Sequence, residues 1–185
     1  MIYAAIAAAL VAVDQLVKYL VMTKIPLGGH VPFIPYIVEL TYVTNTGAAF
    51  SIFSEHTWAL ALVSLVMSLA LALALWRGLF KHPLGKLTLT LLLAGAVGNL
   101  IDRAFRGFVV DMFNVLFMHF AVFNVADICV VVGGIAAGIY YMFLMDKLEP
   151  REEGGHGSAD MPRDTRARIQ VCSEKMEKAA PVLVT

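Results

Sequence analysis

The chain has 185 residues, of which 59% are hydrophobic and 15% charged, and its mean hydropathy is +0.77. Because a soluble domain typically carries about 25% charged residues, this composition is that of a membrane protein. The formal net charge of zero argues against a nucleic-acid-binding surface, and the number and spacing of the two cysteines predict no structural metal site.

A helix that crosses a bilayer needs roughly 20 mostly apolar residues. Four stretches meet this requirement, at about residues 2–22, 58–76, 87–101 and 122–145. The first is not expected to be a cleaved signal peptide, because no basic residue precedes it and because Asp14 and Lys18 lie within it. The sequence therefore predicts an all-α integral membrane domain with four transmembrane helices over residues 1–148.

The segments outside these spans differ in character. Residues 24–56 include a run rich in β-branched residues, which predicts a small extracytoplasmic β-rich segment. Residues 103–121 are too apolar for a solvated loop and are expected to lie in the membrane interface. Residues 149–185 hold glycines and mixed charges, and are expected to form a flexible cytoplasmic tail.

The orientation follows from the basic residues of the short loops. The loop between the second and third spans holds Arg77, Lys81 and Lys86 and no acidic residue, so it is predicted to be cytoplasmic, as are both termini. Arg103 and Arg106 then lie on the outer side, which the same rule disfavours, and this indicates that they have a function there.

Carboxylates inside membrane segments are costly and are functional candidates by default. Asp127 lies near the outer start of the fourth span, Asn124 lies three residues earlier, and Asp111 lies in the preceding outer segment. If that segment folds back, the two carboxylates meet and share a proton, which is the chemistry of an aspartyl protease and needs no metal. The alternative is structural: Asp127 caps the helix and Asp111 binds a loop amide.

Other polar residues also have two interpretations. Asn99 and Arg103 share a face of the third span and either hold a peptide substrate or bond to a neighbouring helix and to lipid head groups. Asn45 either forms a turn or binds substrate. Asp14 and Lys18, four residues apart, are predicted to be a structural pair that neutralises itself.

The sequence lacks the motifs that are typical of several enzyme classes. The sequence contains no His-Glu-x-x-His zinc motif, no Gly-x-Ser-x-Gly elbow and no glycine-rich phosphate loop. This disfavours membrane metalloproteases, serine hydrolases and nucleotide-driven pumps. Two alternatives remain: a small proton-coupled membrane transporter, and a non-enzymatic assembly factor that would leave Asn124 and Asp127 without a role.

The chain resembles the lipoprotein signal peptidase (signal peptidase II) family in five motifs that follow one another in order. They are Asp14-Gln15-x-x-Lys18, Asn45-Thr46-Gly47-Ala48-Ala49-Phe50-Ser51, Gly98-Asn99-Leu100-Ile101-Asp102-Arg103, Val109-Val110-Asp111 and Phe123-Asn124-x-Ala126-Asp127. The chain departs from the family where Ala121-Val122 stands in place of the frequent Pro-Ala, and beyond Met145.

The resemblance implies a function and a site. The family removes the signal peptide from bacterial prolipoproteins, just before a cysteine that carries diacylglycerol. By resemblance, Asp111 and Asp127 are the catalytic pair, and the substrate is bound by Asn45, Asn99, Arg103 and Asn124. The expected location is the bacterial cytoplasmic membrane, with the site toward its outer face. The expected partners are the lipid-modified substrate and membrane lipid, without metal or cofactor.

Overall fold

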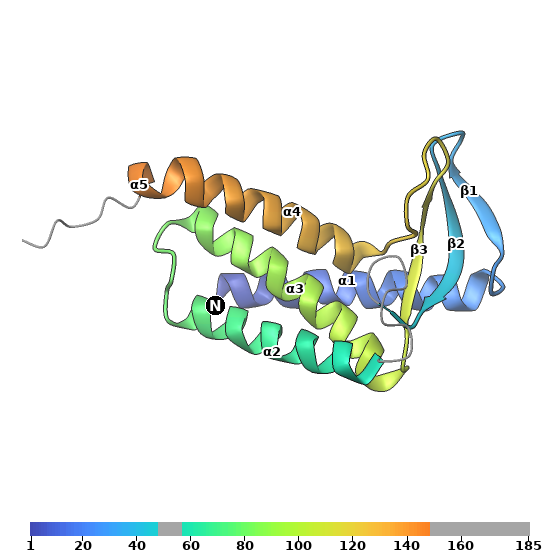
Figure 1. Ribbon diagram of the computed structural model, residues 1–185, viewed down its shortest axis with the longest axis horizontal. Helices are drawn as coiled ribbons and strands as arrows, with labels where there is room; N and C mark the ends of the chain where they lie inside the picture. Colours follow the sequence, from blue (N-terminus) through green and yellow to red (C-terminus); the bar gives the residue numbers. More distant parts are fainter. Residues whose placement is uncertain (48–56, 149–185) are drawn as a thin grey trace, which may run out of the picture. The chain divides into compact units, whose positions relative to one another are not determined.

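The computed structural model describes residues 1–47 and 57–148, and within them four long helices lie side by side, each running opposite to the one before it in the chain (Figure 1). They are α1 (Ile2–Lys24), α2 (Thr57–Trp76), α3 (Pro83–Phe105) and α4 (Val125–Ile139). The π-helix η2 (Tyr140–Leu144) and α5 (Met145–Leu148) prolong α4. Counting that extension, each of the four is 20 to 24 residues long and apolar enough to cross a membrane. The predicted four-span architecture is confirmed.

Two helix boundaries differ from the prediction. The third span was expected at about 87–101, but α3 covers Pro83–Phe105, with Pro83 in its first turn and His82 as its N-cap. The fourth was expected from 122, but α4 begins at Val125, because Asn124 is its N-cap. At these helix ends, Asp102 and Asn124 are buried, whereas His82 and Arg103 are only partly buried.

A three-stranded antiparallel sheet lies at one end of the helices (Figure 1). Its strands, in spatial order, are β1 (His30–Ile34), β2 (Val38–Asn45) and β3 (Val109–Val115). The first two lie within the predicted β-rich segment. The third was not predicted, because residues 103–121 were expected only to lie in the membrane interface; β3 pairs with β2, with Val43 opposite Asp111. The remainder of the β-rich segment, 48–56, and the predicted tail, 149–185, lie outside the described residues.

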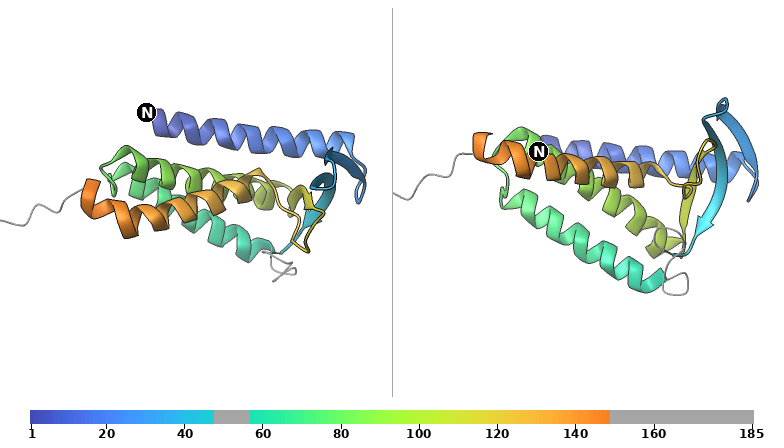
Figure 2. Two further views of the ribbon diagram at one scale, coloured as in Figure 1. Left: turned by 90° about the horizontal axis from the view of Figure 1, so that it is seen from above. Right: turned by 45° about the horizontal axis from the view of Figure 1, so that its top comes forward.

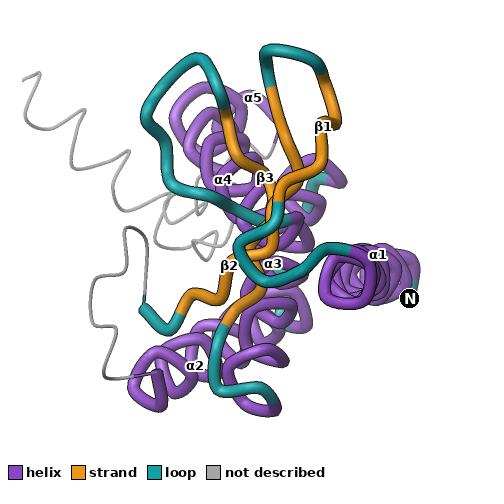
Figure 3. The backbone as a smooth tube through the Cα atoms, turned by 90° about the vertical axis from the view of Figure 1, so that its right-hand side faces the viewer, coloured by secondary structure: helices purple, strands orange, loops and turns teal. Residues whose placement is uncertain are grey.

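The central helix is α3, which packs against α1, α2 and α4. Glycine permits this close approach: a Cβ atom on Gly95 would lie 2.4 Å from the carbonyl oxygen of Ala126 in α4. The sheet lies across the C-terminal ends of α1 and α3 and the N-terminal ends of α2 and α4 (Figures 2 and 3). A buried cluster joins α1 to β3, formed by Val21, Ile25, Val110 and Met112. The fold therefore places β3 and the first turn of α4 at the same end of the helices.

Candidate active site

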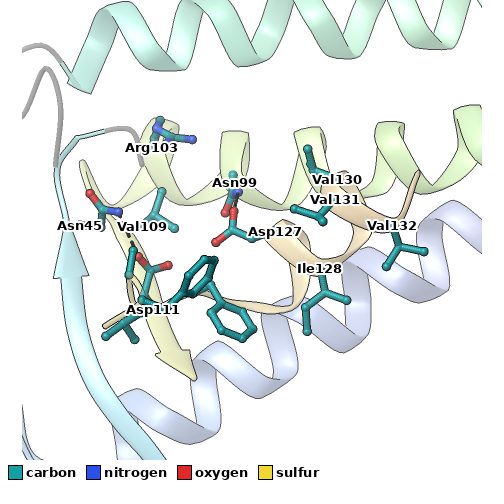
Figure 4. Close-up of a pocket in the computed structure, with 14 residues that line it drawn as sticks. Asn45, Asn99, Arg103, Val109, Asp111, Asp127, Ile128, Val130, Val131 and Val132 are labelled. Carbon is teal, nitrogen blue, oxygen red and sulfur yellow. Dashed lines mark hydrogen bonds between the residues drawn. The ribbon is translucent and has the colours of Figure 1, made fainter. Parts of the chain in front are cut away.

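A cavity of about 440 Å³ opens where β2, β3, α3 and α4 meet (Figure 4). Most of its wall is apolar, including the segment Phe120–Phe123 and three consecutive valines of α4. The polar residues on the wall are Asn45, Asn99, Arg103, Asp111 and Asp127. The structure thus brings together five of the six residues predicted for the catalytic and substrate-binding site, from four different elements.

Asp111 enters the cavity from β3. Its side chain accepts hydrogen bonds from Nδ2 of Asn45 at 3.0 Å and from Nδ2 of Asn124 at 2.6 Å. The residue is 3% exposed, and burial is the main cause that raises the pKa of Asp111 to about 6. The charge of Asp127 also raises this pKa, whereas the two amide donors oppose the shift.

Asp127 enters the same cavity from the first turn of α4 (Figure 4). Its Oδ1 accepts a hydrogen bond from Nδ2 of Asn99 at 2.8 Å, and its Oδ2 accepts one from the backbone N–H of Asn124 at 3.2 Å. The second bond belongs to a capping box, so the helix-capping role is present together with exposure to the cavity. Two carboxylates in one cavity, one of them with a raised pKa, are able to hold a single proton between them.

Asn124 is fully buried behind the cavity rather than on its wall. As the N-cap of α4, it accepts the backbone N–H of Asp127 at Oδ1, over 2.9 Å. Its Nδ2 donates to Asp111 and, at 3.2 Å, to Oδ1 of Asn99. Asn124 was predicted to contact the substrate, but its side chain binds the carboxylate of Asp111 and the backbone N–H of Asp127, because the cap position turns it back toward the helix.

Arg103 is held at the other side of the cavity by two weak hydrogen bonds. Its Nη2 donates to the carbonyl oxygen of Gly47 at 3.3 Å, and its Nη1 donates to Oγ of Ser64 at 3.5 Å. Its buried Nε has no hydrogen-bond partner in the described part of the chain. Asn45 accepts the N–H of Gly47 at Oδ1, over 2.9 Å, so it forms the predicted turn and also contacts Asp111.

The predicted pair of Asp14 and Lys18 is part of a larger buried cluster. Lys18 also contacts Asp102 at 2.9 Å, and Asp102 is bonded in turn to Arg106 and Gln15. No role in the site was predicted from the sequence for Gln15 or Asp102. Arg106 was expected to have a function, because it is a basic residue on the disfavoured side of the membrane. Its partners in the structure are Asp102, one helical turn earlier in α3, and Gln15 on another helix.

A family model described as signal peptidase (SPase) II matches residues 6–144. The lipoprotein signal peptidase of Streptococcus pneumoniae is 46% identical over 138 residues, which are 72% of this chain and 88% of the relative. That of Enterococcus faecalis is 38% identical over 157 residues, 85% of this chain and 96% of the relative.

A solved structure is also similar. It is described as a bacterial membrane enzyme determined by the in meso method at 2.3 Å resolution. It superposes with a TM-score of 0.72 at 29% sequence identity, covering 82% of this chain and 92% of that one. These matches give no support to a transporter. Together with the four membrane-spanning helices, they show that the chain belongs to the signal peptidase II family and is a multi-pass membrane peptidase of the aspartic type.

Proposed function

We propose that Asp111 and Asp127 are the catalytic pair of this peptidase, and that it cleaves lipid-modified prolipoproteins before the lipidated cysteine. The observation that carries this proposal is that two carboxylates from different elements face one largely apolar cavity at the end of the membrane helices. The relatives' name, lipoprotein signal peptidase, supplies the substrate class.

The two carboxylates have different environments, which assigns their roles. The pKa of Asp111 is raised to about 6, chiefly by burial. Asp127 lies at the N-terminal turn of α4, where the helix dipole favours a negative charge, and both of its oxygens accept hydrogen bonds. In the proposed resting state, Asp111 therefore holds the shared proton and Asp127 is the general base.

Hydrolysis then proceeds in two steps. Asp127 takes a proton from a water molecule as the water oxygen bonds to the scissile carbonyl carbon, and Asp111 donates its proton to the carbonyl oxygen. In the second step the carbon–nitrogen bond breaks, Asp127 gives its proton to the leaving amine, and a hydroxyl of the intermediate returns a proton to Asp111. The pair ends in the protonation state in which it began.

The remaining polar residues are proposed to bind the substrate or to hold the pair. Within the described residues, the Nε–H of Arg103 has no hydrogen-bond partner, and Arg103 lines the cavity, so it is suited to a substrate carbonyl. Asn45 and Asn99 lie on the wall, each bonded to one carboxylate. From behind, Asn124 binds the carboxylate of Asp111 through its side chain and that of Asp127 through its backbone N–H. The apolar wall offers a surface for acyl chains and for an apolar signal peptide.

The proposed orientation places the sheet and the cavity at the outer face of the bacterial cytoplasmic membrane, with both termini inside. The loop that contains Arg77 and Lys81 lies at the end of the helices remote from the sheet (Figure 1), and basic loops favour the cytoplasm. Arg106, at the sheet end, is paired with Asp102, so its presence there has a local cause.

This orientation predicts the accessibility of single cysteines. In a background with Cys129 and Cys172 replaced by serine, His30→Cys is expected to react in intact cells with a membrane-impermeant maleimide. Lys81→Cys is expected to react only after the membrane is opened. Labelling of position 81 in intact cells would place the cavity on the wrong side for this function.

The substrate class is tested with the purified protein in detergent. We expect release of the signal peptide from a diacylglyceryl-modified prolipoprotein, and roughly tenfold or more slower release from the same precursor without its lipid, because the apolar wall then loses part of its contact. The products are resolved by mass spectrometry. Equal cleavage of both precursors would show that the enzyme does not recognise the lipid.

A further inference from the structure

Three charged side chains are buried together behind the cavity: Asp14 and Lys18 of α1, and Asp102 of α3. They are at most 1% exposed. The Nζ atom of Lys18 lies 2.8 Å from Oδ2 of Asp14 and 2.9 Å from Oδ2 of Asp102, and it donates to Oδ1 of Asn99 at 3.2 Å. Each of the three ammonium hydrogens therefore has an acceptor.

The two carboxylates that Lys18 joins also hold the backbone beside the catalytic pair. Asp14 accepts the backbone N–H of Ala126 at 2.9 Å, and Ala126 directly precedes Asp127. Asp102 accepts the backbone N–H of Val110 at 3.1 Å, and Val110 directly precedes Asp111. Each member of the pair is thus anchored one residue upstream by a buried carboxylate.

We propose that Lys18 is a positioning residue of the peptidase: by bridging Asp14 and Asp102, it sets the separation between the carboxylates of Asp111 and Asp127. This inference rests on the proposed function, since it requires those two residues to be the catalytic pair. Lys18 touches neither the cavity nor the substrate, and acts through the backbone of β3 and of α4.

The geometry favours positioning over stability alone. A buried ion pair is weak evidence for stability, because desolvation of the charges offsets their attraction, and an isolated pair of Asp14 and Lys18 would not reach the cavity. The N–H of Ala126 lies in the first turn of α4, where it has no partner within the helix. Asp14 supplies that partner and so fixes the turn that carries Asp127.

A third contact of Lys18, with Asn99, also supports a positioning role. Oδ1 of Asn99 accepts from both Lys18 and Asn124, at 3.2 Å each. With both acceptor positions filled, the Asn99 amide has one orientation, which directs its Nδ2 to Asp127 at 2.8 Å. Lys18 thus fixes the donor of Asp127 as well as its backbone.

The test is the double variant Lys18→Met, Asp14→Asn. It removes one positive and one negative charge, and the new amide oxygen can still accept the N–H of Ala126, but the bridge to Asp102 is lost. At matched concentrations of folded protein, we expect kcat to fall about 10- to 100-fold, since small displacements of reacting groups have effects of this size. KM for the lipid-modified precursor is expected to change less, by no more than about threefold, because the cavity wall is untouched.

The pH profile of kcat supplies a second readout. The charged groups that interact with the pair are Arg103 of α3 and Lys18 of α1, and β2 contributes the neutral Asn45. Behind them, Asp14 and Asp102 contact Lys18, and Asp102 also contacts Arg106. The net charge of these groups together is unchanged in the double variant. If the two carboxylates lie farther apart, they interact less, and the two apparent pKa values of the profile move toward each other.

Thr90→Val is the matched control, because Thr90 is fully buried in α3, donates to the carbonyl of Lys86, and does not line the cavity. It is expected to lower the thermal midpoint and to leave kcat and the pH profile unchanged. If the first double variant does not fold, Lys18→Met with Asp102→Asn is the same test, since partly exposed Arg106 can turn to solvent.

A double variant with wild-type kcat and a wild-type pH profile overturns the proposal. Failure of both double variants to fold also overturns it, because the Lys18 bridge would then serve the stability of the fold. These results differ from failure of the proposed function. That failure would appear as near-normal cleavage by Asp111→Asn or Asp127→Asn.

Discussion

Asp111→Asn and Asp127→Asn are each expected to lower kcat for a lipid-modified prolipoprotein by roughly 10²–10⁴-fold, the range of general acid–base catalysis. Asparagine keeps the size of the side chain but carries no titratable proton. The amide of the Asp111→Asn variant cannot give a proton to the carbonyl oxygen, and that of the Asp127→Asn variant cannot take one from water. The measurement is the rate of signal-peptide release by purified variants at matched concentrations of folded protein.

The double variant is expected to be little slower than either single variant, because residues that act as one unit are strongly non-additive. Substrate binding is expected to persist in all three proteins, since the cavity keeps its shape and a neutral amide is less costly to bury than a charge. Binding with little cleavage separates the loss of chemistry from the loss of fold. Near-normal turnover by either single variant would exclude the proposed mechanism.

The same pair predicts the pH dependence of the wild-type enzyme. Because the pKa of Asp111 is raised to about 6, its proton is present below that pH and is lost as the pH rises through it. The kcat/KM of the free enzyme should therefore fall on the alkaline side with an apparent pKa of about 6. A profile that is flat from about pH 4 to about pH 8 would contradict a shared proton.

Arg103→Lys is expected to reduce kcat/KM by about 10- to 100-fold, corresponding to roughly 1.5–3 kcal/mol for hydrogen bonds to a charged group. Lysine keeps the positive charge but lacks the planar guanidinium. It is unable to contact Gly47 and Ser64 together while also presenting a third N–H group, such as the Nε–H of Arg103 that has no partner among the described residues. The yield of folded protein is expected to remain close to that of the wild type.

Arg77→Lys is the control for this substitution, because Arg77 is exposed just beyond the end of α2 remote from the cavity. It is expected to have wild-type kinetics. If Arg103 served only to reach lipid head groups, a lysine would do so equally well. Wild-type kcat/KM in both variants would therefore favour the lipid interpretation of Arg103.

The sequence by itself was sufficient to predict the four membrane spans. A helix satisfies its backbone hydrogen bonds within one segment, and a long apolar run shows where lipid surrounds that helix. It also identified Asp111 and Asp127 as candidates for the catalytic pair, since charged groups are rare in such segments and the costs of burying them are high. The family followed from the order of five short motifs. Each of these inferences uses sequence patterns that can be read without knowing which residues contact one another.

Only the tertiary structure decided which residues meet. Strand β3 was not predicted, because its stability depends on β2, about 70 residues earlier in the chain, and strand pairing is non-local. The role of Asn124 behind the cavity was missed because an N-cap and an inward-facing helical residue have the same sequence pattern. The contacts of Lys18 with Asp102 and Asn99 join residues more than 80 positions apart. A side chain's partners across such distances are set by how the helices pack, and no local pattern records that packing.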